Sequence, residues 1–136
     1  MFIRLESRDY IKGYNMKKIL GLVEKIVIIG KKRKTCEAKF DTGAYRTSVD
    51  IHLAKELGLK KTGKDVLVER ASSTGIRRPL VEVKLKISNK TITTIANLSD
   101  RSHSTQKILV GRDIIFNNFI IDVEKSNKGP RASDLK

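Results

Sequence analysis

The chain has 136 residues, a length typical of one domain, and its 39% hydrophobic content is enough for a modest core. The 29 lysines and arginines against 15 acidic residues give a formal net charge of +14, which indicates either a solvated surface or anionic partners such as nucleic acid, the ribosome, acidic peptides or an anionic membrane surface. No apolar run approaches the roughly 18 residues of a membrane span, and the N-terminus lacks the order of a secretory signal. The single Cys36 excludes an internal disulfide. These features predict a cytoplasmic protein with no membrane segment.

The two ends of the chain differ in pattern from the rest. Residues 1–16 mix charged and apolar side chains without a period, and we expect an N-terminal extension that is either disordered or paired with another chain. Residues 17–124 carry the apolar pattern of a folded domain. Residues 125–136 are rich in Lys, Ser, Asn and Gly, which predicts a flexible basic tail.

Three short runs at the start of the domain predict strands. Residues 19–23 and 26–29 are rich in β-branched side chains, and residues 35–40 alternate between two faces. The third strand leads directly to Asp41. We expect its apolar face to carry Cys36, Ala38 and Phe40.

Residues 48–58 have the apolar spacing of one short helix. Asp50 is the expected N-cap, and Gly58 is a residue that can end the helix. The residues expected on its buried face are Leu53, Ala54 and Leu57.

The second half of the chain is again rich in strands. A mobile hairpin tip is expected at 71–79, where Ser, Thr and Gly are grouped, and a polar loop at 99–107. Many short strands, tight turns and one clear helix predict a small all-β barrel. The expected strands of this half are 66–70, 80–87, 91–98, 108–110 and 119–123.

The segment Phe40-Asp41-Thr42-Gly43-Ala44 follows an apolar strand with an acidic residue. A carboxylate in such a position is costly unless it is hydrogen-bonded or chemically employed. Gly43 permits a turn and a close approach of its N–H, and Thr42 can both donate and accept a hydrogen bond. Asp-Thr-Gly also occurs in ordinary turns, so the tripeptide indicates a functional site only together with a second motif.

The second signal is the segment Ile108-Leu109-Val110-Gly111-Arg112-Asp113-Ile114-Ile115. With the Asp-Thr-Gly segment before it and a Ser/Thr/Gly hairpin between, residues 17–123 resemble the retropepsin-like aspartic peptidases. The Asp100-Arg101-Ser102 loop looks closest to a small prokaryotic branch of that family, often labelled ATP-dependent zinc proteases. Some members of the branch accompany the ligase that adds glutamates to a ribosomal protein, so the resemblance extends to a possible ribosome-associated partner.

The resemblance implies an all-β, single-lobe retropepsin-like closed acid-protease barrel with one short helix and a flap hairpin. It implies catalytic roles for Asp41, Thr42 and Gly43. It also implies structural support of the site by Gly111, Arg112 and Asp113, which pack beneath the active-site loop in the family. The substrate-binding residues that it implies are Ala44, Ser72, Ser73, Thr74 and Gly75.

Peptide hydrolysis in this family needs two carboxylates that share one proton. The chain has one Asp-Thr-Gly, so the resemblance implies a homodimer in which the two copies of Asp41 face each other. Thr42 would hold the two loops in register, and Gly43 would present its N–H to the carboxylates. Ala44 provides no hydroxyl to lower the pKa of the dyad, which predicts an activity optimum less acidic than that of relatives with Ser at this position.

We expect no metal and no cofactor. Zinc catalysis uses about three close ligands, whereas the chain has two His and one Cys, and nothing spaces His52 and His103 to act together. There is no glycine-rich loop for ATP phosphates. Spacing alone does not exclude Ser/His/Asp catalysis, but no Gly-x-Ser-x-Gly segment is present.

Three functions remain open from the sequence. The leading one is a homodimeric aspartic endopeptidase acting on peptides or proteins. Beside the hairpin, Arg70, Arg77 and Arg78 form either a solvated basic edge or a means of recognising acidic substrates. The second is a non-catalytic module of the same fold that binds extended peptides, ribosomal RNA or a ribosomal protein. The third is a structural barrel in which Asp-Thr-Gly is only a turn.

Overall fold

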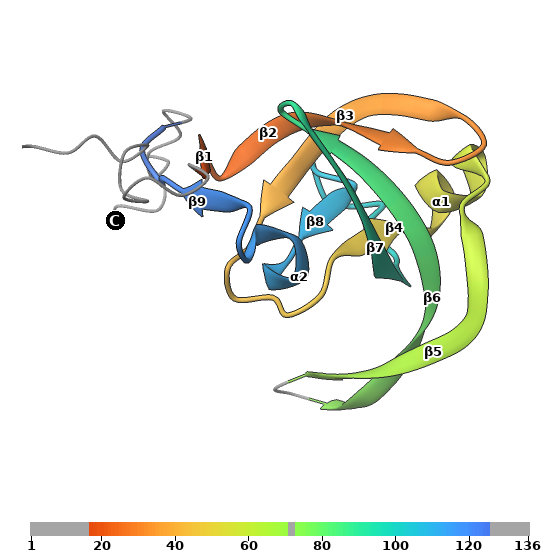
Figure 1. Ribbon diagram of the computed structural model, residues 1–136. Helices are drawn as coiled ribbons and strands as arrows, with labels where there is room; N and C mark the ends of the chain where they lie inside the picture. Colours follow the sequence, from red (N-terminus) through yellow and green to blue (C-terminus); the bar gives the residue numbers. More distant parts are fainter. Residues whose placement is uncertain (1–16, 71–72, 126–136) are drawn as a thin grey trace, which may run out of the picture.

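The computed structural model describes residues 17–70 and 73–125 (Figure 1). The expected N-terminal extension, Ser72 and nearly all of the expected tail lie outside these residues. Among the described residues, no helix has the length and apolar character needed to cross a bilayer. The elements are β1 (Lys18–Leu20), β2 (Val23–Ile29), β3 (Arg33–Phe40), β4 (Ser48–Asp50), α1 (Ile51–Leu57), β5 (Lys60–Arg70), β6 (Ser73–Ile87), β7 (Lys90–Ser99), β8 (Ile108–Val110), α2 (Arg112–Ile115) and β9 (Phe119–Ile121).

Six strands close into a barrel in the order β2-β3-β8-β4-β7-β6, and the ring is completed by pairing of β2 with β6. The barrel is mixed, because β3 pairs with β8 and β4 with β7 in parallel, whereas the other neighbours are antiparallel. β5 pairs only with β6 and stands outside the ring, and β1 pairs in parallel with β9 as a separate two-stranded sheet. The all-β barrel expected from the strand pattern is therefore confirmed.

The barrel interior is filled by aliphatic side chains from alternate strand positions, as the period-2 pattern requires. On β3 the expected inward face is confirmed for Ala38 and Phe40, which are fully buried, whereas Cys36 is only half-buried. The ring of Phe40 meets that of Phe119 edge to face, with centroids 6.3 Å apart. This contact ties the strand that carries Asp41 to β9.

The helix α1 is shorter than expected. Residues 48–50 form β4, which pairs with β7 and β8, so the expectation of helix from residue 48 is wrong. The segment is extended because its backbone pairs with β7 on one side and β8 on the other, which completes the ring between them. The expected cap is confirmed, since the Asp50 carboxylate accepts from the Leu53 N–H and Gly58 ends the helix with a φ of 65°. Its buried residues are the expected Leu53, Ala54 and Leu57.

The β5–β6 hairpin is longer than expected and leaves the barrel as two curved arms (Figure 1). β5 begins at Lys60 rather than at residue 66, and β6 begins at Ser73, so most of the segment expected as a mobile tip is strand. The pairing of the two arms extends to Arg70 and Ser73. The extension was missed because cross-strand backbone pairing does not require the apolar alternation that predicts a half-buried strand.

The structure also contains a second helix, α2, of four residues. The sequence predicted only one helix, at residues 48–58. The helix begins after Gly111, and its Ile114 and Ile115 are buried against the barrel. It is too short for apolar periodicity to reveal it.

Candidate active site

Asp41 lies where β3 leaves the barrel. The last residue of β3, Phe40, pairs in parallel with Val110 of β8, and the Asp41 N–H then donates to the Val110 carbonyl at 2.9 Å. Its backbone is thus fixed by the sheet, while its side chain is half-buried at the edge of the barrel. A carboxylate in this position is held rigidly without being removed from water.

The loop after Asp41 folds back on the carboxylate. The Gly43 N–H donates to Asp41 Oδ1 at 2.9 Å, and the Ala44 N–H donates to the Asp41 carbonyl at 3.2 Å. A Cβ on Gly43 would lie 3.2 Å from Asp41 Oδ1, which is tighter than an ordinary contact. Thr42 and Gly43 are exposed. The loop therefore orients one carboxylate oxygen and presents the residues around it at the surface.

Arg112, which follows β8, fixes this loop by hydrogen bonds to its backbone carbonyls. Arg112 Nη1 donates to the Thr42 carbonyl at 2.9 Å, and the Arg112 N–H donates to the Ala44 carbonyl at 2.8 Å. The Arg112 guanidinium also lies 5.9 Å from the ring centroid of Tyr45, a side chain that is 72% exposed. Arg112 thus contacts carbonyls and an aromatic ring of its own chain.

A second set of hydrogen bonds joins α2 to the residue before β4 and to β7. Asp113 Oδ1 accepts from both the N–H and the hydroxyl of Thr47, at 3.0 and 2.8 Å, and its Oδ2 accepts from the Thr94 hydroxyl at 2.9 Å. Thr47 Oγ1 accepts in turn from the Gly111 N–H at 3.2 Å. A Cβ on Gly111 would lie 2.7 Å from the carbonyl carbon of Arg46, so the packing admits only glycine there. These contacts fix the two motifs against each other.

A cleft of about 920 Å³ lies between the Asp41 loop, the β5–β6 hairpin and the end of β7. Gly43 and Ala44 line it, whereas Asp41 itself does not, and lies next to it in the chain. Apolar side chains from the two arms of the hairpin form one wall of the cleft. They are Val66, Leu67, Val68 and Ile76.

The hairpin residues predicted to bind substrate are placed as follows. Ser72 lies outside the described residues, and Ser73, Thr74 and Gly75 belong to the first part of β6. A Cβ on Gly75 would lie 2.7 Å from Leu67 Cδ1, so the two arms are in close contact here. Of the hairpin residues whose side chains the structure describes, Gly75 does not line the cleft, whereas Leu67 and Ile76 do.

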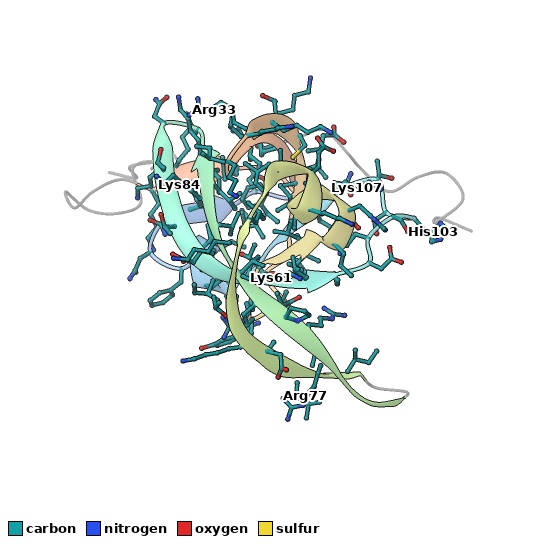
Figure 2. All side chains as sticks on the ribbon, turned by 90° about the vertical axis from the view of Figure 1, so that its right-hand side faces the viewer. Arg33, Lys61, Arg77, Lys84, His103 and Lys107 are labelled. Carbon is teal, nitrogen blue, oxygen red and sulfur yellow. The ribbon has the colours of Figure 1, made fainter. Side chains whose placement is uncertain are left out.

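Among the residues that the structure describes, four arginines line the cleft, and Asp100 is the one acidic residue of that set. Arg46 Nη1 donates to the Ile95 carbonyl at 3.0 Å, and Arg78 Nη1 donates to Asn97 Oδ1 at 3.3 Å. Arg77 forms an ion pair of 2.6 Å with Asp65 on the hairpin, and Figure 2 shows it at the far end of the molecule from Arg33. The fourth arginine is Arg101.

Arg101 is fixed by the loop that precedes β8. Its N–H donates to Asp50 Oδ1 at 2.7 Å, and its Nε donates to the Gln106 carbonyl at 3.0 Å. Burial lowers the pKa of its guanidinium, and the nearby Asp50 and Asp41 carboxylates act in the opposite direction. Lys107 Nζ stabilises the same loop by donating to the carbonyls of Arg101, Ser102 and Ser104 at 3.1, 2.8 and 3.0 Å.

Two buried polar side chains of the cleft were missed from the sequence. Asn97 and Ser48 are 4% and 6% exposed, and the Ser48 hydroxyl donates to Asn97 Oδ1 at 2.7 Å. Asn97 occurs in the apolar run 95–98, and such an interruption is the signal that could have identified it. The parallel pairing of β4 with β7 brings the two residues together, and short-range sequence patterns do not reveal that pairing.

Within the described residues, no group of three or more His, Cys, Asp or Glu side chains is arranged to hold a metal ion. His52 is exposed on α1, and His103 is exposed in the loop before β8.

The comparisons with known proteins concern the fold. No family model matches the chain, and no curated protein matches it. Among solved structures, the chain is similar to Lpg0085, a protein of unknown function (DUF785) from Legionella pneumophila subsp. pneumophila str. Philadelphia 1. The identity is 23% and the TM-score 0.55, over 78% of this chain and 93% of that one.

It is also similar to EIAV protease complexed with the inhibitor HBY-793, at 17% identity and a TM-score of 0.50, over 68% of this chain and 83% of the viral one. The protease of simian foamy virus (mac) matches at 13% identity and a TM-score of 0.49, over 68% of this chain and 91% of that one. At such identities the likeness concerns the fold alone. The chain has a single-lobe, retropepsin-like closed barrel with a flap hairpin.

Proposed function

We propose that the protein is a homodimeric aspartic endopeptidase in which each chain contributes one Asp41. The observation that carries the proposal is the loop at the end of β3, where the Gly43 N–H donates to Asp41 Oδ1 at 2.9 Å beside a cleft covered by a hairpin. The retropepsin-like fold supports the same reading. The chain has one Asp-Thr-Gly segment, so a dyad needs two copies.

The exposed surface around the loop supports self-association. Thr42 and Gly43 are exposed, and Tyr45 beside them is 72% exposed with the Arg112 guanidinium against its ring. Aromatic and arginine side chains are enriched at protein interfaces. In the proposed dimer the two-fold axis passes between the two loops, so that the carboxylates share a proton.

Hydrolysis then follows from the charge state of the pair. The ionised Asp41 takes a proton from water as the water oxygen bonds to the peptide carbonyl carbon, while the protonated Asp41 of the other chain gives its proton to the carbonyl oxygen. One hydroxyl of the resulting diol returns its proton to the pair, which then holds two protons. The amide nitrogen takes one of these two protons as the C–N bond breaks. The products are a carboxylic acid and an amine, and the dyad regains its single proton.

Acidic peptides are the proposed substrates. The described part of the cleft is lined by four arginines and one acidic residue. A guanidinium has five N–H donors, so the single anchoring bonds of Arg46 and Arg101 leave donors for a substrate carboxylate. The apolar hairpin wall would pack against the aliphatic parts of an extended chain. The resemblance of the Asp100-Arg101-Ser102 loop to the prokaryotic branch of the family is a separate proposal, and with it the association with a ribosomal-protein ligase.

The test is the variant Asp41→Asn, assayed with denatured casein and with a fluorogenic peptide rich in glutamate. We expect cleavage to fall by at least about 10³-fold, because the amide cannot act as the base. Glu37→Gln is the matched control, since it removes one exposed carboxylate from the same strand and should leave cleavage unchanged. Cleavage retained by Asp41→Asn would remove this residue from the mechanism.

A mixing experiment tests the dimer separately. An excess of Asp41→Asn chains should capture wild-type chains in mixed dimers with one catalytic carboxylate, and so suppress wild-type cleavage. An equal excess of Glu37→Gln should not suppress it. If the excess of Asp41→Asn leaves wild-type cleavage unchanged, the two chains do not share a site.

A further inference from the structure

The outer wall of the barrel has a basic face at the end of the strands opposite the cleft. Ile29 of β2 pairs with Arg33 of β3 on one side and with Lys84 of β6 on the other. Directly paired residues project on the same side of a sheet, so they form a row across the wall. The two rows of the face are Arg33, Ile29, Lys84 and Thr93, and Thr35, Val27, Lys86 and Thr91.

The cations of the basic face are exposed and not neutralised. Among the residues that the structure describes, Arg33, Lys84 and Lys86 form no ion pair within 4 Å, whereas Glu82 beside them pairs with Lys60 at 3.6 Å. Glu37, the acidic residue on β3, lies directly opposite Lys25. The exposed turn between β2 and β3 adds Lys31 and Lys32. The face therefore carries a net positive charge.

The chemistry of the face selects among anionic partners. Its remaining exposed side chains are the hydroxyls of Thr35, Thr91 and Thr93, and Val27 and Ile29 are half-buried between the rows. The large hydrophobic side chains found exposed in the described chain lie elsewhere: Tyr45, Ile51, Leu67, Ile76, Phe116 and Val123. A protein interface needs an apolar centre and a membrane surface needs apolar insertion, whereas nucleic-acid interfaces are polar and basic.

We propose that the basic face binds the sugar–phosphate backbone of nucleic acid. The lysine and arginine side chains neutralise phosphates, and the threonine hydroxyls donate to phosphate oxygens. The face has no aromatic side chain on which a base could stack, so binding is independent of base sequence.

The basic face and the cleft can be occupied at the same time. Arg33 begins β3 and Phe40 ends it next to Asp41, so the chain between Arg33 and Asp41 spans up to about 26 Å. Figure 2 shows Arg33 and Lys84 near one end of the molecule and Arg77 of the cleft near the other. Binding at the face is therefore separable from peptide hydrolysis.

The experiment measures the binding of a fluorescent 20-nucleotide single-stranded RNA by anisotropy across a salt series. The test variant combines Arg33→Gln, Lys84→Gln and Lys86→Gln. The control variant combines Lys18→Gln, Lys55→Gln and Lys64→Gln, which removes the same charge from exposed positions on three other elements. Circular dichroism and thermal melting establish that both variants fold.

We expect wild type to bind with a logarithmic salt slope that the test variant reduces by about 2, since each phosphate contact on a single strand contributes about 0.7. Affinity should fall roughly tenfold or more in the test variant and less than about threefold in the control. The proposal is overturned if wild type does not bind, if both variants lose affinity equally, or if polyaspartate displaces the RNA at an equal concentration of charge. Asp41→Asn should bind as wild type does, whether or not the chain proves to be a peptidase.

Discussion

The substitution Thr47→Val tests how the two motifs are held together. Thr47 is fully buried, and its hydroxyl donates to Asp113 Oδ1 at 2.8 Å while accepting from the Gly111 N–H at 3.2 Å. Valine has nearly the same shape and keeps the backbone bond to Asp113, so the change removes the two hydroxyl bonds without opening a cavity.

The expected loss of stability follows from these contacts. The buried Gly111 N–H is left without its acceptor, which costs about 1–3 kcal/mol. The bond to Asp113 adds about 1 kcal/mol, a value reduced because that carboxylate is partly exposed to water. The free energy of unfolding should therefore fall by about 2–4 kcal/mol, and the melting temperature by roughly 10–20 °C.

The assay is a urea titration followed by far-ultraviolet circular dichroism, with the slope m compared between variants. The control is Thr35→Val on the exposed face of β3, which should change stability by less than about 0.5 kcal/mol. A double-mutant cycle of Thr47→Val with Asp113→Ala should give a coupling energy of about 0.5–3 kcal/mol. A loss below about 1 kcal/mol for Thr47→Val at unchanged m, or a coupling energy near zero, would refute the reasoning.

Two further predictions concern the cleft and the lone thiol. Arg101→Gln should raise KM for glutamate-rich peptides by roughly tenfold with little change in kcat, and leave a neutral peptide unaffected; an equal loss on both peptides would contradict a role in substrate binding. Burial raises the pKa of the Cys36 thiol, with Lys34 acting against this and Glu56 adding to it. Iodoacetamide should therefore modify Cys36 more slowly than it modifies the thiol of free glutathione at neutral pH. This pKa is higher in the folded chain than in the unfolded chain. The contribution of Cys36 to the free energy of unfolding is therefore complete at a pH below the ordinary thiol pKa, and it is lost as the pH rises through the pKa of the folded chain. Modification of Cys36 at the rate of free glutathione would contradict this reading.

The local elements of the chain could be read from residue patterns because short-range chemistry decides them. The cap at Asp50, the end of α1 at Gly58 and the inward face of Ala38 and Phe40 all follow from neighbours within a few residues. The strand at 108–110 was expected and is β8. The order of these elements, with Asp-Thr-Gly first and Gly-Arg-Asp last, was sufficient to indicate the retropepsin-like barrel.

The hairpin and the cleft could not be predicted in the same way. The long arms of the β5–β6 hairpin are set by cross-strand pairing, and the short α2 lacks the length for a helical period. The cleft residues Arg46, Asn97 and Arg101 come from separate elements, so no local pattern joins them. They meet only because β4 pairs with β7 and the loop before β8 folds back onto Asp50.

The sequence by itself determined where the chain turns, which strand delivers Asp41 and that each copy has one Asp-Thr-Gly. Tertiary structure alone decided that Thr47, Gly111 and Asp113 lock the two motifs together and that arginines converge on the cleft. The physical reason is the range of the interactions. Caps, turns and strand faces depend on residues a few positions apart, whereas a cleft depends on the closure of a barrel that pairs residues far apart in the chain.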